Sequence, residues 1–309
     1  LGISGCLLGE SVRFDGGHKR HSYINDVLTP YFQFKSYCPE VAIGLGTPRP
    51  PIRLVNVGQD LRVCGVNDPT LDVTEKLTAF AQEVSTEIPH FVGYIFKSKS
   101  PSCGMARVKV YGAKGGMPMH HAGLYAHALQ QRFPDMPMEE EGRLNDPVLR
   151  ENFIARVFIY ARWLKLCAQT RSFGDIVAFH TQHKLMLLAH NQAAYRRLGQ
   201  MIASRPKQLN EAWLKTYQRE LMSCLSRKSS RRNHANVLQH VLGYFKTALT
   251  QADKAELVEC IDQYRVGQIP LIVPIKLLKN VLRRYPNEYL SSQVYFSPYP
   301  EELGLRNHI

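Results

Sequence analysis

The sequence predicts an α/β N-terminal domain with a mainly parallel sheet, plus an all-α C-terminal helical-bundle domain. Three observations lead to this prediction. Short apolar runs alternate with amphipathic stretches in the first half, as is typical of strands joined by helices. Apolar residues in the second half recur at spacings of three and four. Basic residues are also unevenly distributed: residues 1–170 hold 19 Lys and Arg against 16 Asp and Glu, whereas residues 171–309 hold 20 against 10.

The elements of the first half are predicted from its apolar runs and turn residues. Apolar runs bounded by glycine, asparagine or proline predict strands at 1–8, 32–38, 52–58, 61–66 and 91–98. Helical periodicity predicts helices at 25–32, 68–90 and 119–133. A proline-rich acidic connector at 134–147 leads into a long helix at 148–169. We therefore expect the domains to span 1–171 and 172–309.

The second half is predicted to contain helices and no convincing strand. The expected helices share apolar stripes of helical period and occupy 179–203, 209–226, 234–249, 253–267 and 269–286. Such a set of amphipathic helices buries its apolar stripes by forming a bundle.

Composition narrows the classes of protein. No run of about 18 apolar residues is present, so we expect no membrane-spanning helix. The first residues lack the pattern of a signal peptide, and seven cysteines, an odd number, favour reduced thiols in the cytoplasm over a disulfide framework. The net charge of +13 predicts an anionic partner, with nucleic acid the leading candidate.

Three cysteines stand at the ends of predicted strands, next to glycine or proline. They are Cys6 in "SGCLLG", Cys38 in "YCPEV" and Cys103 in "SPSCGM". Ligands of parallel sheets gather beyond the carboxyl ends of the strands, so these thiols are expected to converge at one edge. No CxxC-type spacing of an electron-transfer cluster, zinc ribbon or haem site occurs. The residues alone leave four alternatives: buried apolar cysteines, a zinc site, a thiol nucleophile, or a three-cysteine iron–sulfur cluster with one open iron.

Longer segments resemble known families. Four segments of the first half resemble the bacterial thiouracil desulfidases, known as the TudS family. They are "ISGCLLGESVRFDGGHKR", "YCPEVAIGLGTPRPPIRLV", "FKSKSPSCG" and "EEEGRLNDPVLRENFIARVFIY". In the second half, the YbgA-type helical domain is similar to "FHTQHKLMLLAHNQAAYRRLG", "RRNHANVLQHVLGYFK", "IPLIVPIKLLKNVLRRYP" and "YLSSQVYFSPYPEELGLRN". The fused pair resembles the RudS family of tRNA 4-thiouridine desulfidases.

The resemblance implies a 4Fe–4S cluster bound by three cysteines, which map to Cys6, Cys38 and Cys103. It also implies that Glu40 of the "CPE" motif is the acid/base group. Ser100 of the "SPSC" motif is expected to assist, with Ser102 as the neighbouring candidate. In the implied reaction, the open iron takes the substrate's sulfur and a water molecule attacks C4 of the base. No ligand role can be matched to Cys64, for which packing is the better interpretation.

Two further groups of residues are candidates for binding. The "DGGHKRH" loop is expected to contact substrate through Asp15, His18, Lys19 and Arg20. Arg49 and Arg53 of "PRPPIR" are interpreted as charge on a rigid turn. Basic faces on the predicted helices are expected to follow an RNA backbone. Those candidates are Arg227, Lys228, Arg231, Arg232, Lys276, Lys279 and Arg283.

The sequence thus predicts a cytoplasmic, iron–sulfur-dependent desulfidase acting on 4-thiouridine in tRNA, with no obligate protein partner and no membrane association. One alternative is a desulfidase of free thiouracil or another small thio-compound, in which the helical domain contacts proteins. The other is a metal-containing RNA-binding regulator without catalysis.

Overall fold

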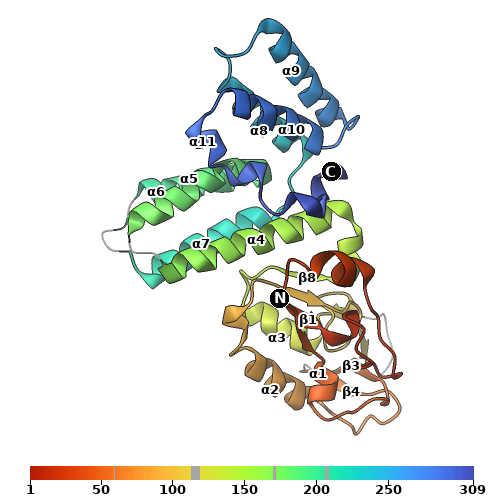
Figure 1. Ribbon diagram of the computed structural model, residues 1–309. Coiled ribbons are helices and arrows are strands. Elements are labelled where there is room, and N and C mark those ends of the chain that lie inside the picture. Colours follow the sequence, from red (N-terminus) through yellow and green to blue (C-terminus); the bar gives the residue numbers. More distant parts are fainter. Residues whose placement is uncertain (59, 113–118, 170–171, 205, 207–208) are drawn as a thin grey trace. The chain divides into compact units, whose positions relative to one another are not determined.

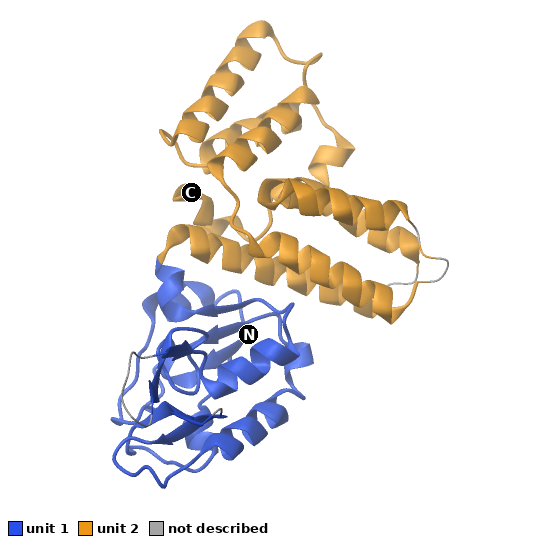
Figure 2. Cartoon of the chain, turned by 180° about the vertical axis from the view of Figure 1, so that it is seen from behind, with its two compact units in different colours: residues 1–145 blue, residues 146–309 orange. Residues whose placement is uncertain are grey.

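The computed structural model describes residues 1–309 except 59, 113–118, 170–171, 205 and 207–208. The chain forms two compact units, residues 1–145 and 146–309 (Figure 2). This division differs from the boundary expected after residue 171, a position that lies outside the described residues. The long helix α4 (Pro147–Gln169) groups with the second unit because it packs against α7 (Glu211–Ser226). Trp163 of α4 anchors that packing by donating a hydrogen bond to Gln218 of α7, with a nitrogen–oxygen distance of 2.9 Å.

The first unit contains a fully parallel sheet of four short strands (Figure 1). Its order is β2-β1-β5-β8, and the strands are β1 (Gly2–Ser4), β2 (Lys35–Tyr37), β5 (Tyr94–Phe96) and β8 (Met138–Glu140). The inner strands β1 and β5 are buried along their whole length, in line with their largely apolar sequences. Strand β8 falls in the predicted connector, because "MEE" has the composition of a solvated segment although it pairs with β5.

A second sheet of four strands is mixed, with order β4-β3-β6-β7. Its strands are β3 (Ile52–Val57), β4 (Asp60–Gly65), β6 (Val108–Gly112) and β7 (Met119–His121). Strands β3 and β6 are parallel, and the outer pairs are antiparallel. The helix predicted at 119–133 is therefore correct only for α3 (Leu124–Arg132), since residues 119–121 pair with β6. The expected α/β class with a mainly parallel sheet is confirmed.

The helices of the first unit are shorter than the sequence suggested. Helix α2 (Thr74–Val84) starts six residues after Asp68, because the Asp68 carboxylate accepts a hydrogen bond from the Thr70 amide at 3.0 Å and forms a turn instead. A π-helical turn occupies Tyr23–Leu28, and α1 spans Pro39–Ala42. Helix α2 packs against α3, and aromatic rings fill the space between α3 and β5, with the Tyr94 and Tyr125 hydroxyls 3.1 Å apart.

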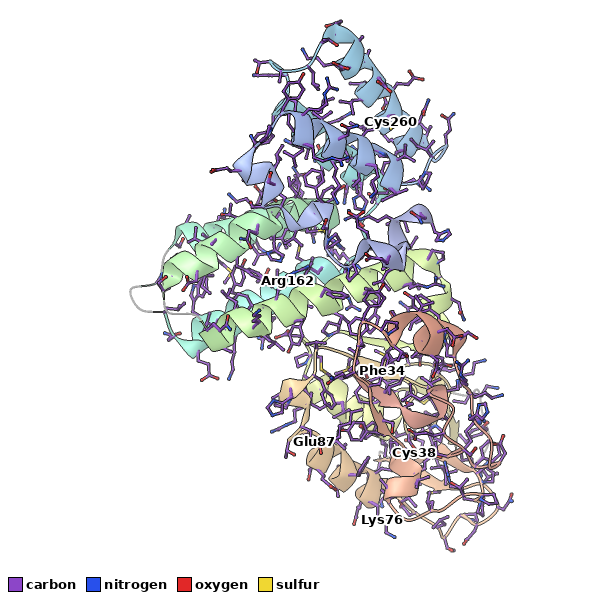
Figure 3. The ribbon with its side chains drawn as sticks, in the orientation of Figure 1. Phe34, Cys38, Lys76, Glu87, Arg162 and Cys260 are labelled. Atoms are coloured by element: carbon purple, nitrogen blue, oxygen red, sulfur yellow. The ribbon has the colours of Figure 1, made fainter. Side chains whose placement is uncertain are left out.

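The described residues of the second unit form helices joined by loops and contain no strand, which confirms the predicted class. Its helices after α4 are α5 (Phe173–His190), α6 (Gln192–Ala203), α7, α8 (Arg231–Gly243), α9 (Gln251–Val266), α10 (Ile272–Arg284) and α11 (Glu288–Ser291). Cys260 lies on α9 (Figure 3). The single helix predicted at 179–203 is divided at Asn191. The Asn191 side chain accepts hydrogen bonds from the amides of Ala193 and Ala194 and so begins a new helix. Among the described residues, no helix combines the length and apolar character needed to cross a bilayer.

Burial of histidine makes the stability of the helical unit depend on pH. Burial lowers the pKa of His183 from 6.5 to about 4, although the imidazole also contacts the Phe179 carbonyl oxygen at 2.7 Å. Between these values the unfolded chain binds a proton that the folded chain does not bind. Stability is therefore fully present above pH 6.5 and is lost as the pH falls toward 4.

We expect His183 alone to reduce the free energy of unfolding by about 2 kcal/mol between neutral pH and about pH 5. Urea titrations followed by tryptophan fluorescence measure this loss, because both tryptophans, Trp163 and Trp213, lie in the helical unit. His183→Asn keeps a donor for the Phe179 carbonyl but does not titrate, so its stability should change less with pH. An unchanged pH dependence in this variant would contradict the assignment.

Candidate active site and metal centre

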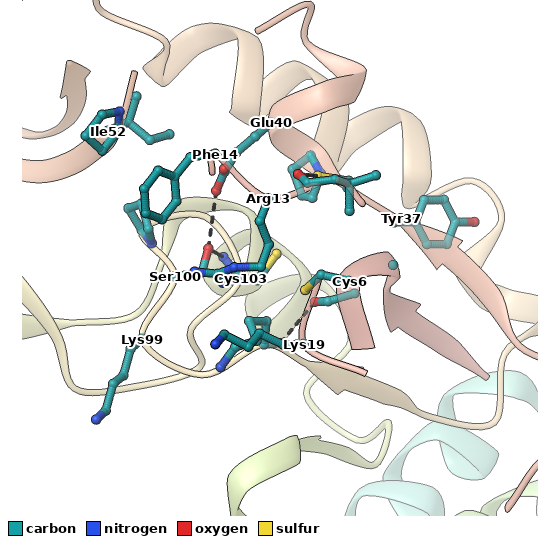
Figure 4. Close-up of a pocket in the computed structure, with 18 of the residues that line it drawn as sticks. Cys6, Arg13, Phe14, Lys19, Tyr37, Glu40, Ile52, Lys99, Ser100 and Cys103 are labelled. Carbon is teal, nitrogen blue, oxygen red and sulfur yellow. Dashed lines mark hydrogen bonds between the residues drawn. The ribbon is translucent and has the colours of Figure 1, made fainter. Parts of the chain in front are cut away.

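The three candidate cysteines lie at the carboxyl ends of three neighbouring parallel strands. Cys6 is in the 3-10 turn that follows β1, Cys38 directly follows β2, and Cys103 is in the loop after β5. All three line one pocket of about 420 Å³ (Figure 4). The topology therefore brings together side chains that are far apart in the sequence.

The Cys103 loop is fixed by the start of helix α3. The amides of Leu124 and Ala126 donate to the carbonyl oxygens of Pro101 and Ser102, at 3.2 and 3.0 Å. A Cβ atom at Gly123 would lie 2.6 Å from the Ser102 carbonyl, so glycine permits this close approach. Cys103 is held in place with only 5% of its surface exposed.

The three thiols are poor acids in this pocket. Burial raises the pKa of Cys6 to about 11, and burial also raises the pKa values of Cys38 and Cys103. The pKa of each thiol also depends on nearby charged groups. Glu40 and the other two thiols further raise the pKa of Cys103. Thiolates at this edge therefore need a strongly electron-accepting group to stabilise them, as a bound metal or iron–sulfur cluster would do.

The donor set fits a cluster better than a single ion. Within the described residues, no group of three or more His, Cys, Asp or Glu side chains could hold one metal ion. Ligands of one zinc ion lie about 2.3 Å from the metal and hence close to each other. The cysteines of a 4Fe–4S cluster bind different irons, so their sulfur atoms are held further apart. Three thiols that line one pocket are the donor type and number that such a cluster would use.

Glu40 lies in the same pocket, on α1 directly after Cys38 and Pro39. One carboxylate oxygen accepts hydrogen bonds from the hydroxyls of Ser102 and Ser100, at 2.9 and 3.3 Å. The bond to Ser100 is drawn in Figure 4. The Ser100 hydroxyl also accepts from the amides of Ser102 and Cys103, at 3.2 and 3.1 Å. Ser100 lines the pocket, whereas Ser102 is fully buried, so both serines contact Glu40 but only Ser100 faces the pocket.

Arg49 is the partner of the second Glu40 oxygen, and its interpretation as turn charge is wrong. Its side chain is only 3% exposed and forms an ion pair with Glu40. The same guanidinium donates to the carbonyl oxygens of Val12 and Gly46, at 3.0 and 2.8 Å. Val12 also accepts a hydrogen bond from the Cys38 thiol at 3.5 Å. Arg49 therefore holds the carboxylate and the loop before it in one fixed arrangement.

We expect Arg49→Ala to lower the free energy of unfolding of the first unit by about 3 kcal/mol, because it leaves the largely buried Glu40 carboxylate without its counter-charge. Differential scanning calorimetry of the full chain measures the loss. Arg53→Ala is the matched control from the same "PRPPIR" segment, since the Arg53 guanidinium lies over the Tyr111 ring at 5.1 Å, an interaction worth about 0.5–1 kcal/mol. Equal losses in the two variants would contradict the role of the ion pair.

The "DGGHKRH" residues are placed differently from one another. Only Lys19 lines the pocket, and its amide donates to the Cys6 carbonyl at 2.8 Å. Asp15 accepts from the Gly17 amide and pairs with Arg13. Arg20 pairs with Asp26, and the His18 imidazole accepts from the Arg20 amide. Direct substrate contact by Asp15, His18 and Arg20 stays a prediction, while their hydrogen bonds give the loop its shape.

Lys97 also lines the pocket, and the sequence did not indicate its partner. Lys97 forms an ion pair with Glu141, which also accepts from the Ser98 amide at 2.7 Å. Lys97 lowers the pKa of Cys6, in opposition to the larger effect of burial. Phe14 and Arg13 also line the pocket, and Cys64 does not, because it belongs to β4 of the other sheet.

The basic candidates of the helical unit are exposed to different degrees. Lys276 and Lys279 both pair with Glu301 and line a cleft of about 590 Å³ together with Arg283. Arg231 donates to the carbonyl oxygens of Tyr264 and Ile269, so it has a structural role. The other candidates are exposed: Arg227, Lys228, Arg232 and Arg283.

The sequence singled out Glu40 and the three cysteines, which share one pocket in the structure, but it did not reveal Arg49 as the partner of Glu40. The sequence shows only an arginine between two prolines. This pattern does not indicate that the side chain is buried against Glu40, nine residues earlier. Phe14 was also missed, and its signal was an aromatic residue directly before the Asp-Gly-Gly turn.

Comparisons with known proteins agree with the division into two units. A family model described as 2-thiouracil desulfurase matches residues 1–141, and a model described as DUF1722, a protein of unknown function, matches residues 184–300. The chain is 32% identical over 158 residues to the uncharacterized protein YbgA of Escherichia coli (strain K12), covering 51% of this chain and 94% of YbgA.

Two further relatives align with the chain over about the length of its first unit. The chain is 29% identical over 155 residues to the uncharacterized protein YbbK of Bacillus subtilis (strain 168), covering 47% of this chain and 97% of YbbK. A solved structure of the 4Fe–4S-dependent thiouracil desulfidase TudS shares 32% identity and a TM-score of 0.38, covering 47% of this chain and 93% of that chain. The chain therefore belongs to the 2-thiouracil desulfurase family through residues 1–141, fused to a helical domain of the YbgA (DUF1722) family.

Proposed function

We propose that the chain is a 4Fe–4S-dependent desulfidase that removes sulfur from 4-thiouridine in tRNA and releases uridine and hydrosulfide. The observation that carries this proposal is the shared pocket of Cys6, Cys38 and Cys103 with the Glu40 carboxylate. The three cysteines would hold the cluster, and the cluster would supply a soft Lewis acid suited to a thiocarbonyl sulfur. The relative TudS, whose description names both the cluster and thiouracil, supports the same assignment.

Glu40 is the proton-transfer group in this proposal. Its carboxylate takes a proton from the water molecule that adds to C4 of the base, and it returns that proton as the carbon–sulfur bond breaks. The base gains one oxygen from water and loses one sulfur as hydrosulfide, so no net electron transfer is needed. Arg49 and Ser100 keep the carboxylate oriented toward the pocket through the hydrogen bonds described above.

Hydrosulfide release by the anaerobically reconstituted full chain tests the proposal. Thiolated tRNA, free 4-thiouridine and free 4-thiouracil are compared as substrates at equal concentration. The proposal requires that every cluster-loaded sample release hydrosulfide from thiolated tRNA. It also requires that thiolated tRNA have the highest kcat/KM of the three substrates. A preference for free 4-thiouracil would replace it with a small-molecule desulfidase, and no release from any substrate would leave a non-catalytic RNA-binding role.

The helical unit is proposed to bind the tRNA backbone, because its chain segment carries most of the excess positive charge. We expect the logarithm of the tRNA binding constant to fall linearly with the logarithm of salt concentration. Lys228→Ala combined with Arg232→Ala should make this slope shallower by about one to two. Lys276 and Lys279 should contribute less than Arg283, since Glu301 already neutralises them in part.

Filter binding at several salt concentrations measures the slope. Lys215→Ala is the matched control, because Lys215 is exposed on α7, pairs with Glu211 and is not one of the proposed RNA-binding residues. A wild-type chain whose tRNA binding does not depend on salt would eliminate the RNA role.

A further inference from the structure

Phe14 is an exposed aromatic residue at the candidate active site. Its side chain is among the exposed large apolar residues of the described chain, with 41% of its surface accessible, and it lines the pocket of the three cysteines. The other exposed large apolar residues described in β3, β6 and β7 of this unit, Val57, Tyr111 and Met119, are not among the residues that line this pocket. Figure 4 shows the Phe14 ring at the pocket with the Glu40–Ser100 hydrogen bond.

The backbone that carries Phe14 is tightly constrained. The Arg13 amide donates to the Gly17 carbonyl at 3.2 Å, and the Gly16 amide donates back to the Arg13 carbonyl at 2.9 Å. Gly16 has a φ of 75°, which glycine adopts without strain, so the turn closes tightly. The ring is therefore presented from a small closed loop, and the conformational freedom that an exposed loop side chain usually retains is reduced.

The same loop is joined to the proton-transfer group. The Phe14 carbonyl accepts a hydrogen bond from the Arg49 amide at 2.9 Å, and the Arg49 side chain holds Glu40. The Arg13 guanidinium lies over the Phe14 ring, 5.4 Å from its centroid. One side of the ring is thus covered by a cation, and the position of the ring is tied to that of the Glu40 carboxylate.

We propose that Phe14 stacks on the thiolated pyrimidine and fixes the plane of the base relative to Glu40. This inference rests on the proposed function and adds the residue that recognises the base. A pyrimidine is planar and presents its π face to a neighbouring aromatic ring, and Arg13, which also lines the pocket, places a cation beside that ring. A stacked base lies parallel to the Phe14 ring, which fixes the plane that contains C4, and the Glu40–Arg49 arrangement keeps the carboxylate at a constant position.

Substitutions that separate ring stacking from apolar bulk test the proposal in the full chain. Phe14→Ala removes the ring, Phe14→Leu keeps apolar volume, and Phe14→Tyr keeps the ring. Tyr111→Leu is the control, because Tyr111 is similarly exposed at 42% and is also covered by an arginine, Arg53, but lies outside the pocket. Equilibrium dialysis with 4-thiouridine 5′-monophosphate, carried out in the Glu40→Gln background so that hydrosulfide release is suppressed, measures nucleotide binding. Steady-state kinetics with thiolated tRNA and an intact Glu40 measures KM and kcat.

Phe14→Ala and Phe14→Leu should weaken nucleotide binding and raise KM by roughly 5- to 100-fold, with a much smaller change in kcat. Phe14→Tyr and Tyr111→Leu should remain within about threefold of the wild type, and all variants should keep the wild-type melting temperature and iron content. Wild-type binding by Phe14→Leu would overturn stacking, and so would a wild-type chain that binds no thiolated nucleotide. Binding that depends on Phe14 without hydrosulfide release would refute the proposed reaction and leave the stacking role supported.

Discussion

Glu40→Gln is expected to reduce hydrosulfide release from thiolated tRNA by about 10²- to 10⁴-fold, the usual contribution of a positioned acid/base group. Glutamine keeps one oxygen, which can accept from Arg49, and its amide group can donate to a serine hydroxyl, but it cannot take a proton from water. The arrangement of the pocket should therefore survive the substitution. Turnover is measured by hydrosulfide release under single-turnover conditions, and iron and sulfide contents are measured on the same samples.

Glu83→Gln is the matched control for this prediction, since Glu83 is exposed on α2. It should have wild-type turnover. A Glu40→Gln chain that retains its cluster and its wild-type rate would show that another group transfers the proton. Loss of iron in Glu40→Gln would instead show that the carboxylate supports the metal centre.

Cys103→Ala is expected to prevent stable incorporation of the cluster, and with it all desulfidation. Cys103 is the most deeply buried of the three pocket cysteines and is fixed by the hydrogen bonds between its loop and α3. Its removal leaves only two thiolates for a group that the family resemblance assigns to three. Anaerobic reconstitution followed by iron and sulfide quantification measures the loss.

Two cysteines outside the pocket provide controls for the same experiment. Cys64 lies in β4 and Cys260 on α9, so Cys64→Ala and Cys260→Ala should retain wild-type iron content. If Cys64→Ala loses iron while Cys103→Ala retains it, the assignment of the ligands is incorrect. A comparable partial loss in all three variants would indicate a general effect of substitution and would equally contradict the prediction.

The convergence of the cysteines was predictable because each signal is local. An uninterrupted apolar run identifies β1 and β5, a turn residue marks the end of each strand, and the parallel topology then places all the strand ends at one edge. The strands β7 and β8 were not predictable in the same way. Each has three residues of mixed polarity. Strand β8 exists through pairing with β5, which is distant in the sequence, and β7 through antiparallel pairing with β6.

The support of Glu40 was less accessible to sequence reasoning than Glu40 itself. The "CPE" motif identifies the carboxylate, but burial of Arg49 depends on how its loop folds over Val12 and Gly46. A similar limit applied to the break at Asn191, because asparagine is common both on the surface of a helix and at its start. Such contacts follow from tertiary packing, which overrides local propensity.

The strands that bring the cysteines together contain only three residues each. So short a ladder supplies few backbone hydrogen bonds to resist separation of the segments that it joins. An inorganic group bridging the ends of β1, β2 and β5 would act as a cross-link between distant parts of the chain and would reduce the entropy of the unfolded state. Oxidative loss of that group would then expose the first unit to local opening and proteolysis, in addition to ending its chemistry.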